Sequence, residues 1–154
     1  MVTIFLTRHA HAGKRSAWEG DDAARPLSAR GMAQALDLAS VLGGEAPGRL
    51  VSSPYVRCLQ SLEPLAARLG LDVEPHETLA EGAGIDRALA LLLELDLVNG
   101  VACSHGDLIP PLLRSLCDLG MTTEGPLLDQ KGSLWVIETD AGRPISGTYR
   151  PPAH

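Results

Sequence analysis

The sequence predicts an α/β fold with three αβα layers, in which helices cover both faces of a mostly parallel sheet that has an antiparallel edge strand. Short aliphatic and β-branched runs alternate with longer segments of helical period, an alternation typical of βαβ units. Several runs lead directly into polar or turn residues, as strands do where they end. At 154 residues, the chain is expected to form one domain over residues 1–150, followed by a frayed tail over residues 151–154.

Four runs are predicted as strands from their aliphatic and β-branched residues: TIFLT, RLVSS, VACS and SLWVIET. Residues 72–76 are expected to add a short strand. GRPISGTYR follows SLWVIETDA closely enough to return beside it through a turn at residues 140–142, so we expect it to be the antiparallel edge strand. The segment MTTEGPLLDQK before SLWVIET is interpreted as a plain connection.

Helical spacing of apolar residues predicts the first two helices. One follows Ser28, a candidate N-cap, and ends at the glycine pair 43–44. The next opens at Ser53-Pro54, and Pro64 is expected to bend or restart it.

Two further helices are predicted in the second half of the chain. The first spans about residues 85–95. Asp107 is a candidate cap for the second, in which Pro110 and Pro111 fall in the first turn, where missing N–H groups cost least.

Composition excludes several classes of function. A net charge of −6 suits solubility and argues against binding nucleic acid or an anionic membrane surface. The apolar runs are too short to span a bilayer, and the N-terminus lacks a basic leader and a cleavage pattern. We therefore expect a cytoplasmic protein.

Cysteine is not expected to be the nucleophile. Cys58, Cys103 and Cys117 are odd in number, lie among apolar neighbours and lack metal-ligand spacing, which favours buried free thiols. The segment from Cys103 to Arg114 is too long to form the tight loop of a thiol phosphatase.

Charged and titratable side chains follow the predicted strands at the edge of the sheet where ligands of open α/β folds bind. Arg8 and His9 end the first strand, Arg57 follows the second by one helical turn, and His105 follows the VACS strand. Glu81 belongs to the connection after residues 72–76. Two arginines, two histidines and a carboxylate are thus expected to converge.

This set suits phosphoryl transfer. Arginine forks bind oxyanions bidentately, and a neutral imidazole is a competent nucleophile near pH 7. His9 could attack phosphorus and carry the group as phosphohistidine until water removes it, with no metal or other cofactor. Glu81 could protonate the leaving oxygen and then activate the water.

The ordered set TRHA, LSARGMAQA, SSPYVRCLQS, Glu81 and CSHGD resembles the histidine phosphatase superfamily, also called phosphoglycerate-mutase-like, over about residues 3–140. The resemblance implies the fold of that family. It also implies that His9 is the phosphorylated nucleophile, that Arg8, Arg57 and His105 bind the phosphate, and that Glu81 stands where the proton donor often lies.

Within that family, the chain lacks the insertions that form a lid, and in this it is similar to the short SixA-type phosphohistidine phosphatases. The runs RPLSARGMAQA, CSHGDLIPPLL, KGSLWVIE and GRPISGTY resemble the phosphatase domain fused to a Nudix hydrolase in some actinobacterial proteins, although no Nudix pattern occurs here. We expect a protein phosphohistidine substrate, with a nucleotide or other small phosphate ester as the alternative.

Three rival functions stay open. A metal-dependent hydrolase is one, because His9 and His11 share one strand face and nearby histidine or acidic side chains could join them, but Arg8 and Arg57 would repel a cation. A phosphate-binding module without turnover is the second. A mutase is the third, although it needs an enclosed site that excludes water.

The loop after the first strand holds residues whose role the sequence leaves open. His11 could donate to the phosphate or face solvent, and the solvent-facing position is favoured. Trp18 could form a substrate lip but more often such a residue packs on its own loop. Asp21 and Asp22 are interpreted as solvated charges. Oligomeric state is not readable from the sequence.

Overall fold

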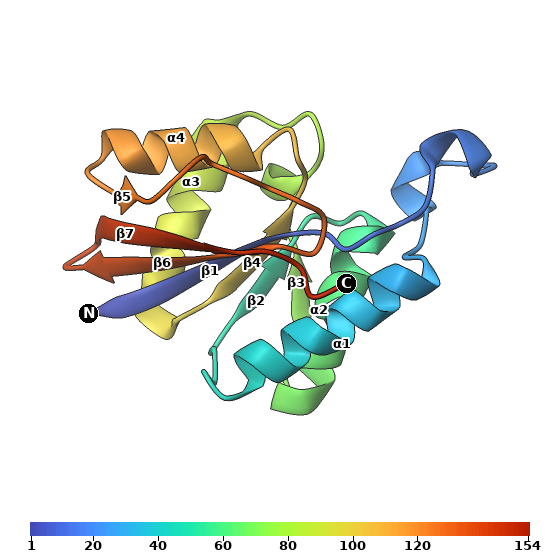
Figure 1. Ribbon diagram of the computed structural model, residues 1–154, viewed down its shortest axis with the longest axis horizontal. Helices are drawn as coiled ribbons and strands as arrows, with labels where there is room; N and C mark the ends of the chain where they lie inside the picture. The colour runs from blue at the N-terminus through green and yellow to red at the C-terminus, as the bar shows by residue number, and fades with distance from the viewer.

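A seven-stranded sheet forms the centre of the computed structural model, which describes residues 1–154 (Figure 1). Its strands lie in the order β3 (Val73–Pro75), β2 (Leu50–Ser52), β4 (Val101–Ser104), β1 (Val2–Arg8), β6 (Leu134–Asp140), β7 (Arg143–Arg150) and β5 (Thr122–Thr123). The first four are parallel to one another, and β6 is antiparallel to both β1 and β7. The predicted strands and the mostly parallel sheet are confirmed.

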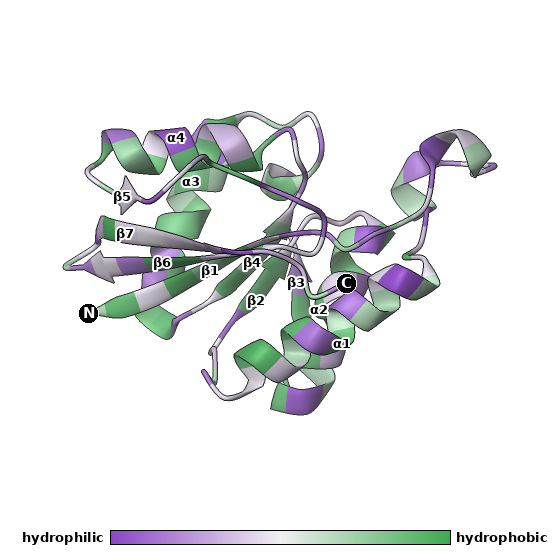
Figure 2. Ribbon diagram, viewed as in Figure 1, coloured by the Kyte–Doolittle hydropathy of each residue, from purple (hydrophilic) through white to green (hydrophobic).

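Two helices cover each face of the sheet, which confirms the three layers. The helices are α1 (Ala29–Gly43), α2 (Val56–Leu69), α3 (Ile85–Glu94) and α4 (Ile109–Asp118). Along β1, Ile4 and Leu6 pack in the core under α3 and α4, whereas Phe5 packs under α1 and α2, as the period-two alternation of a strand requires. Figure 2 shows green apolar residues in the central strands and mixed colours on the helices, as expected for helices with one buried face.

Four single-turn 3₁₀ helices complete the structure: η1 (Arg15–Ala17), η2 (Asp22–Ala24), η3 (Glu77–Leu79) and η4 (Leu95–Val98). The segment that carries η1 and η2 joins β1 to α1 and extends beyond the rest of the domain, at the right of Figure 1.

The boundaries of the first two helices agree in part with the sequence. Ser28 caps α1, because its Oγ accepts a hydrogen bond from the Gly31 N–H at 3.1 Å. The second helix, α2, begins at Val56, later than the predicted Ser53-Pro54 opening, and continues through Pro64 without a second start.

The predicted cap on α4 is wrong. The Asp107 carboxylate accepts a hydrogen bond from the Gly82 N–H at 2.7 Å, and Leu108 is the N-cap without a side-chain bond. A capping side chain bonds the N–H of the second or third helical residue. In α4 these are Pro110 and Pro111, which have no N–H, so a cap there would have no donor.

The edge of the sheet also differs from the prediction. The last strand, β7, runs antiparallel to β6 as expected, but the two-residue β5 pairs with its outer side. The segment interpreted as a plain connection therefore contains the edge strand.

Residues 151–154, expected to fray, form no helix or strand, and the C-terminus lies beside α1 (Figure 1). The His154 carbonyl accepts hydrogen bonds from Arg30 at 3.1 Å and Gln34 at 3.0 Å. The cysteines are free thiols, as predicted, with Cys58 and Cys103 buried. All four helices fall short of the length and apolar character that a membrane crossing requires.

A glycine allows the chain that follows β1 to cross the first turn of α1. The His11 carbonyl accepts a hydrogen bond from the Ser28 N–H at 3.0 Å, and the His11 N–H donates to Gln34 Oε1 at 2.8 Å. A Cβ at Gly31 would lie 1.9 Å from the His11 carbonyl oxygen, so no other residue fits without displacing this backbone. The glycine in LSARGMAQA thus fixes how the loop after His9 leaves the sheet.

We predict that Gly31→Ala lowers the free energy of unfolding by about 1–3 kcal/mol, because the clash outweighs the roughly 1 kcal/mol gain in helix propensity. Gly44→Ala is the matched control, since a Cβ there meets nothing within 4 Å and its φ is −74°. Urea denaturation would measure both. A Gly31→Ala midpoint equal to or above that of Gly44→Ala would contradict the close approach.

Candidate active site

The register between β1 and β4 brings two histidines together. Arg8 pairs with Ser104, and the His9 N–H donates to the Ser104 carbonyl at 3.1 Å, so His9 and His105 follow neighbouring strands at the same level. Their ring centroids lie 5.4 Å apart. The carboxyl edge, where β1, β2 and β4 end, therefore holds the centre of the predicted site.

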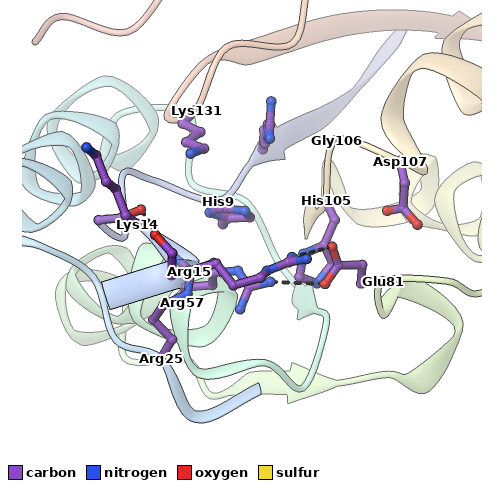
Figure 3. Close-up of a pocket in the computed structure, with 13 residues that line it drawn as sticks. His9, Lys14, Arg15, Arg25, Arg57, Glu81, His105, Gly106, Asp107 and Lys131 are labelled. Carbon is purple, nitrogen blue, oxygen red and sulfur yellow. Dashed lines mark hydrogen bonds and ion pairs between the residues drawn. The ribbon is translucent and has the colours of Figure 1, made fainter. Parts of the chain in front are cut away.

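A cavity of about 730 Å³ opens at this edge, and all five side chains predicted from the sequence line it (Figure 3). These are Arg8, His9, Arg57, Glu81 and His105. The rest of the lining consists of Gly13, Lys14, Arg15, Ser16, Arg25, Gly106, Asp107 and Lys131. None of these side chains is hydrophobic, so the cavity suits a polar and charged ligand.

His9 is held as a neutral imidazole with one free nitrogen. Its Nδ1 lies 2.8 Å from the Ala10 carbonyl oxygen, which can only accept, so Nδ1 carries the proton and Nε2 keeps its lone pair. Burial lowers the pKa of His9 from 6.5 to about 3, against the raising effect of the Ala10 bond, and the nearby His105, Arg57 and Arg8 lower it further. At neutral pH the ring is therefore uncharged, the state in which an imidazole can act as a nucleophile.

Three buried nitrogens at the cavity have no hydrogen-bond partner in the protein: Arg8 Nε, Arg57 Nε and His105 Nδ1. Ser53 Oγ accepts from the Tyr55 N–H at 3.2 Å and lies 2.8 Å from His105 Nε2. If the Ser53 hydroxyl donates to Nε2, Nδ1 carries the ring proton. Because a buried donor without an acceptor costs about 1–3 kcal/mol, these groups together favour an oxyanion in the cavity.

Two carboxylates orient the Arg57 guanidinium, which is 1% exposed. Its Nη2 donates to Asp22 at 3.1 Å and to Glu81 at 3.2 Å, while Nη1 donates to the Asp22 carbonyl at 2.9 Å. Asp22 also accepts from Arg25 Nε at 3.0 Å, and Glu81 accepts from Arg15 Nη2 at 2.8 Å. These bonds occupy both outer nitrogens of Arg57, whose buried Nε is left without a partner.

Arg8 is oriented in a similar way from another segment. Its Nη1 donates to the Asp129 carbonyl at 3.1 Å and lies 3.7 Å from the Asp129 carboxylate. A Cβ at Gly106 would lie 2.7 Å from the Arg8 Cζ, so the glycine in CSHGD makes room for this guanidinium.

Asp22 and the segment before β6 were misjudged from the sequence. Asp22 is not a solvated charge, because it forms ion pairs with three arginines of the site, Arg15, Arg25 and Arg57. Burial would raise the pKa of Asp22, but the Arg25 hydrogen bond and the charges of Arg57 and Arg15 hold it below its ordinary value. The expected plain connection supplies Asp129 and Lys131, and no local pattern in the sequence marks either as a site residue.

His11 and Trp18 take no part in the cavity lining. Since β1 ends at Arg8, the period-two spacing that would place His11 beside His9 does not extend that far, and His11 Nδ1 lies 2.7 Å from Ser28 Oγ. The histidine pair required by the metal-hydrolase alternative is therefore not brought together.

Trp18 donates to the Asp21 carbonyl at 2.9 Å and so packs on its own loop, whose neighbouring residues do line the cavity.

The depressed pKa of His9 predicts a pH-dependent contribution to stability. In the unfolded chain His9 binds a proton near pH 6.5, whereas in the folded chain it does so only near pH 3. The contribution of the neutral ring to the free energy of unfolding is therefore fully present above pH 6.5 and is lost as the pH falls toward 3. The free energy of unfolding of the native chain, relative to His9→Gln, should therefore fall by about 2 kcal/mol between pH 7 and pH 5. Urea denaturation at both pH values would measure this difference, and parallel pH profiles would refute the neutral buried imidazole.

Comparison with known proteins agrees with the sequence resemblance. The family model for the histidine phosphatase superfamily (branch 1) matches residues 4–88. The chain is 34% identical over 155 residues to the 8-oxo-(d)GTP phosphatase of Mycolicibacterium smegmatis, and the alignment covers 97% of this chain and 48% of the relative. The chain thus spans about half the length of that curated relative.

Solved structures confirm the phosphoglycerate-mutase-like fold. The protein histidine phosphatase SixA complexed with tungstate is similar with a TM-score of 0.72 and 25% identity, covering 97% of this chain and 94% of SixA. The phosphoserine phosphatase of Entamoeba histolytica in complex with 3-phosphoglyceric acid gives a TM-score of 0.73 with 16% identity, covering 100% of this chain and 99% of the other. Since the matched family model spans more than half of the sequence, the chain belongs to the histidine phosphatase superfamily.

Proposed function

We propose that this chain is a phosphatase that transfers the phosphoryl group of its substrate to His9 and then to water. The observation that carries the proposal is the neutral His9 ring, with Nε2 unprotonated, in a polar cavity that also holds three unpartnered buried donors. A nucleophile and an oxyanion site are the two parts that a phosphoryl transfer needs.

The reaction proceeds in two displacements. The Nε2 lone pair attacks phosphorus while the bond from phosphorus to the leaving group breaks, and the leaving group takes up a proton. Arg8, Arg57 and His105 hold the phosphoryl oxygens through their free nitrogens. Water then attacks the phosphohistidine, the N–P bond breaks with its electron pair returning to Nε2, and inorganic phosphate leaves.

Glu81 is proposed to move the protons in both displacements. It lines the cavity, but its two oxygens are bonded to Arg15 and Arg57. To protonate a leaving group, Glu81 must exchange one of these partners for the substrate. This makes Arg15, from the exposed segment after β1, the partner that is easier to displace, because its side chain is 62% exposed and that of Arg57 is 1% exposed.

A protein-borne phosphohistidine is the proposed substrate. No hydrophobic side chain lines the cavity to contact a nucleobase, and SixA, a protein histidine phosphatase, shares the fold over nearly the whole chain. A nucleotide is the second candidate, favoured by the 34% identity to the 8-oxo-(d)GTP phosphatase. Either substrate would place its scissile phosphoryl group beside His9, with the adjoining group in the same cavity.

Trapping the intermediate tests the mechanism. After incubation with a labelled phosphoryl donor and an alkaline denaturing quench, the label should be found on His9. His9→Ala should lose turnover of an aryl phosphate by roughly three or more orders of magnitude. His11→Asn is the matched control, because His11 lies outside the cavity lining, and it should keep most activity. Binding of phosphate without hydrolysis by the native chain would instead identify a binding module.

Replacing Glu81 separates the two kinds of substrate. General acid catalysis is worth about 10²–10⁴-fold, and an alkoxide leaves less readily than an imidazole, so Glu81→Gln should slow ester hydrolysis by about 10²-fold and phosphohistidine hydrolysis by less than about tenfold. Single-turnover rates of phosphoryl transfer to His9 from a nucleoside monophosphate, which releases an alkoxide, and from a phosphorylated carrier protein measure both. Equal losses would remove Glu81 from the leaving-group step.

A further inference from the structure

Lys131 lines the cavity without an ion-pair partner. It lies on the opposite side of His9 from Arg57 and Arg15, with its amine directed toward His9 (Figure 3). No carboxylate lies within ion-pair distance of it, whereas each arginine of the lining has one. Burial and the charges of Arg8, Arg25, Arg57 and Arg15 lower the pKa of Lys131, as expected for an unbalanced cation.

The backbone around Lys131 is fixed to the nucleophile's own strand. The Gly132 N–H donates to the carbonyls of Arg8 at 3.2 Å and His9 at 3.1 Å. Gly132 has a φ of +82°, and a Cβ there would lie 2.8 Å from the Gln34 side chain, so glycine is required for this close approach. The lysine is therefore presented from a defined position beside His9.

The scissile phosphoryl group does not need Lys131. Arg8, Arg57 and His105, which line the cavity, already offer it nitrogens that have no partner in the protein. The cavity of about 730 Å³ falls in the range that accommodates drug-sized ligands, so it holds more than one phosphoryl group, and its lining has no apolar side chain. What lies next to the scissile phosphate is therefore polar, and the unpaired amine favours an anion.

We propose that Lys131 forms a second anion subsite, which binds a carboxylate or further phosphoryl group of the substrate beside the scissile phosphate. Lys14, which also has no ion-pair partner, lines the same cavity and adds to its positive charge. The proposal specifies which substrates the phosphatase would bind. It rests on the proposed function, because that function defines the first subsite as the place of the scissile phosphoryl group. The anion can come from a diphosphate-type small molecule or from an acidic side chain beside a phosphorylated residue.

Non-hydrolysable anions test the subsite without turnover. By isothermal titration calorimetry, methylenediphosphonate and phosphonoacetate should bind the full chain at least about tenfold more tightly than methylphosphonate, a gain of about 1.4 kcal/mol. Lys131→Met should remove most of that gain while changing methylphosphonate binding by less than about threefold. Lys131→Arg, which keeps the charge, should restore it.

The outcome distinguishes the sources of the anion and the two proposals. Phosphoserine peptides with glutamate or glutamine beside the phosphorylated residue form a second arm. If the native chain binds the glutamate peptide more tightly than the glutamine peptide and Lys131→Met does not, the subsite serves protein substrates. If Lys131 affects only the binding of methylenediphosphonate, the subsite serves small molecules. The subsite would be overturned if Lys131→Met weakened the binding of methylphosphonate, which has one anionic group, as much as that of the probes with two anionic groups, or if it weakened neither. A differential loss without any phosphatase activity of the native chain would overturn the proposed function alone.

Discussion

The parallel pairing of β1 with β4 is the constraint on which the rest of the site depends. Because Arg8 is level with Ser104, His9 and His105 leave neighbouring strands together, and a shift of one residue would turn every side chain of β1 to the opposite face. The two apolar cores fix this register, since Ile4 and Leu6 must face α3 and α4 while Phe5 faces α1 and α2. Core packing therefore positions the nucleophile.

The balance of charges in the cavity is the second constraint on the site. The chain carries a net charge of −6, yet its cavity gathers four arginines and two lysines around a neutral histidine. Asp22, Glu81 and Asp129 offset part of this repulsion and hold the guanidinium groups by their outer nitrogens. The nitrogens left without partners belong to residues that line a cavity without hydrophobic side chains, so a bound oxyanion would offset their positive charge and supply hydrogen-bond acceptors.

We expect substrate choice to depend on residues outside the shared centre of the site. Similar folds occur in the SixA protein histidine phosphatase and in a phosphoserine phosphatase, so the sheet and its carboxyl edge do not select between them. In this chain the parts that border the cavity outside the centre are the segment with η1 and η2 and the segment before β6. These supply Arg15 and Lys131, two cations outside the set proposed to hold the first phosphoryl group.

The sequence by itself determined the layer order, most element positions and five of the thirteen residues that line the cavity. Hydrophobic period and strand ends are local properties, and the parallel topology brings the ends of several strands to one edge of the sheet. Only the tertiary structure decided the roles of Asp22, Asp107, Asp129 and Lys131. Each lies outside the main helices and strands, in a segment where the sequence is equally compatible with a solvated charge. Its role follows from long-range partners, such as Arg57 for Asp22 and Gly82 for Asp107, which no local pattern specifies. The outer position of β5 was missed for the same reason, since two threonines become a strand only through pairing with β7.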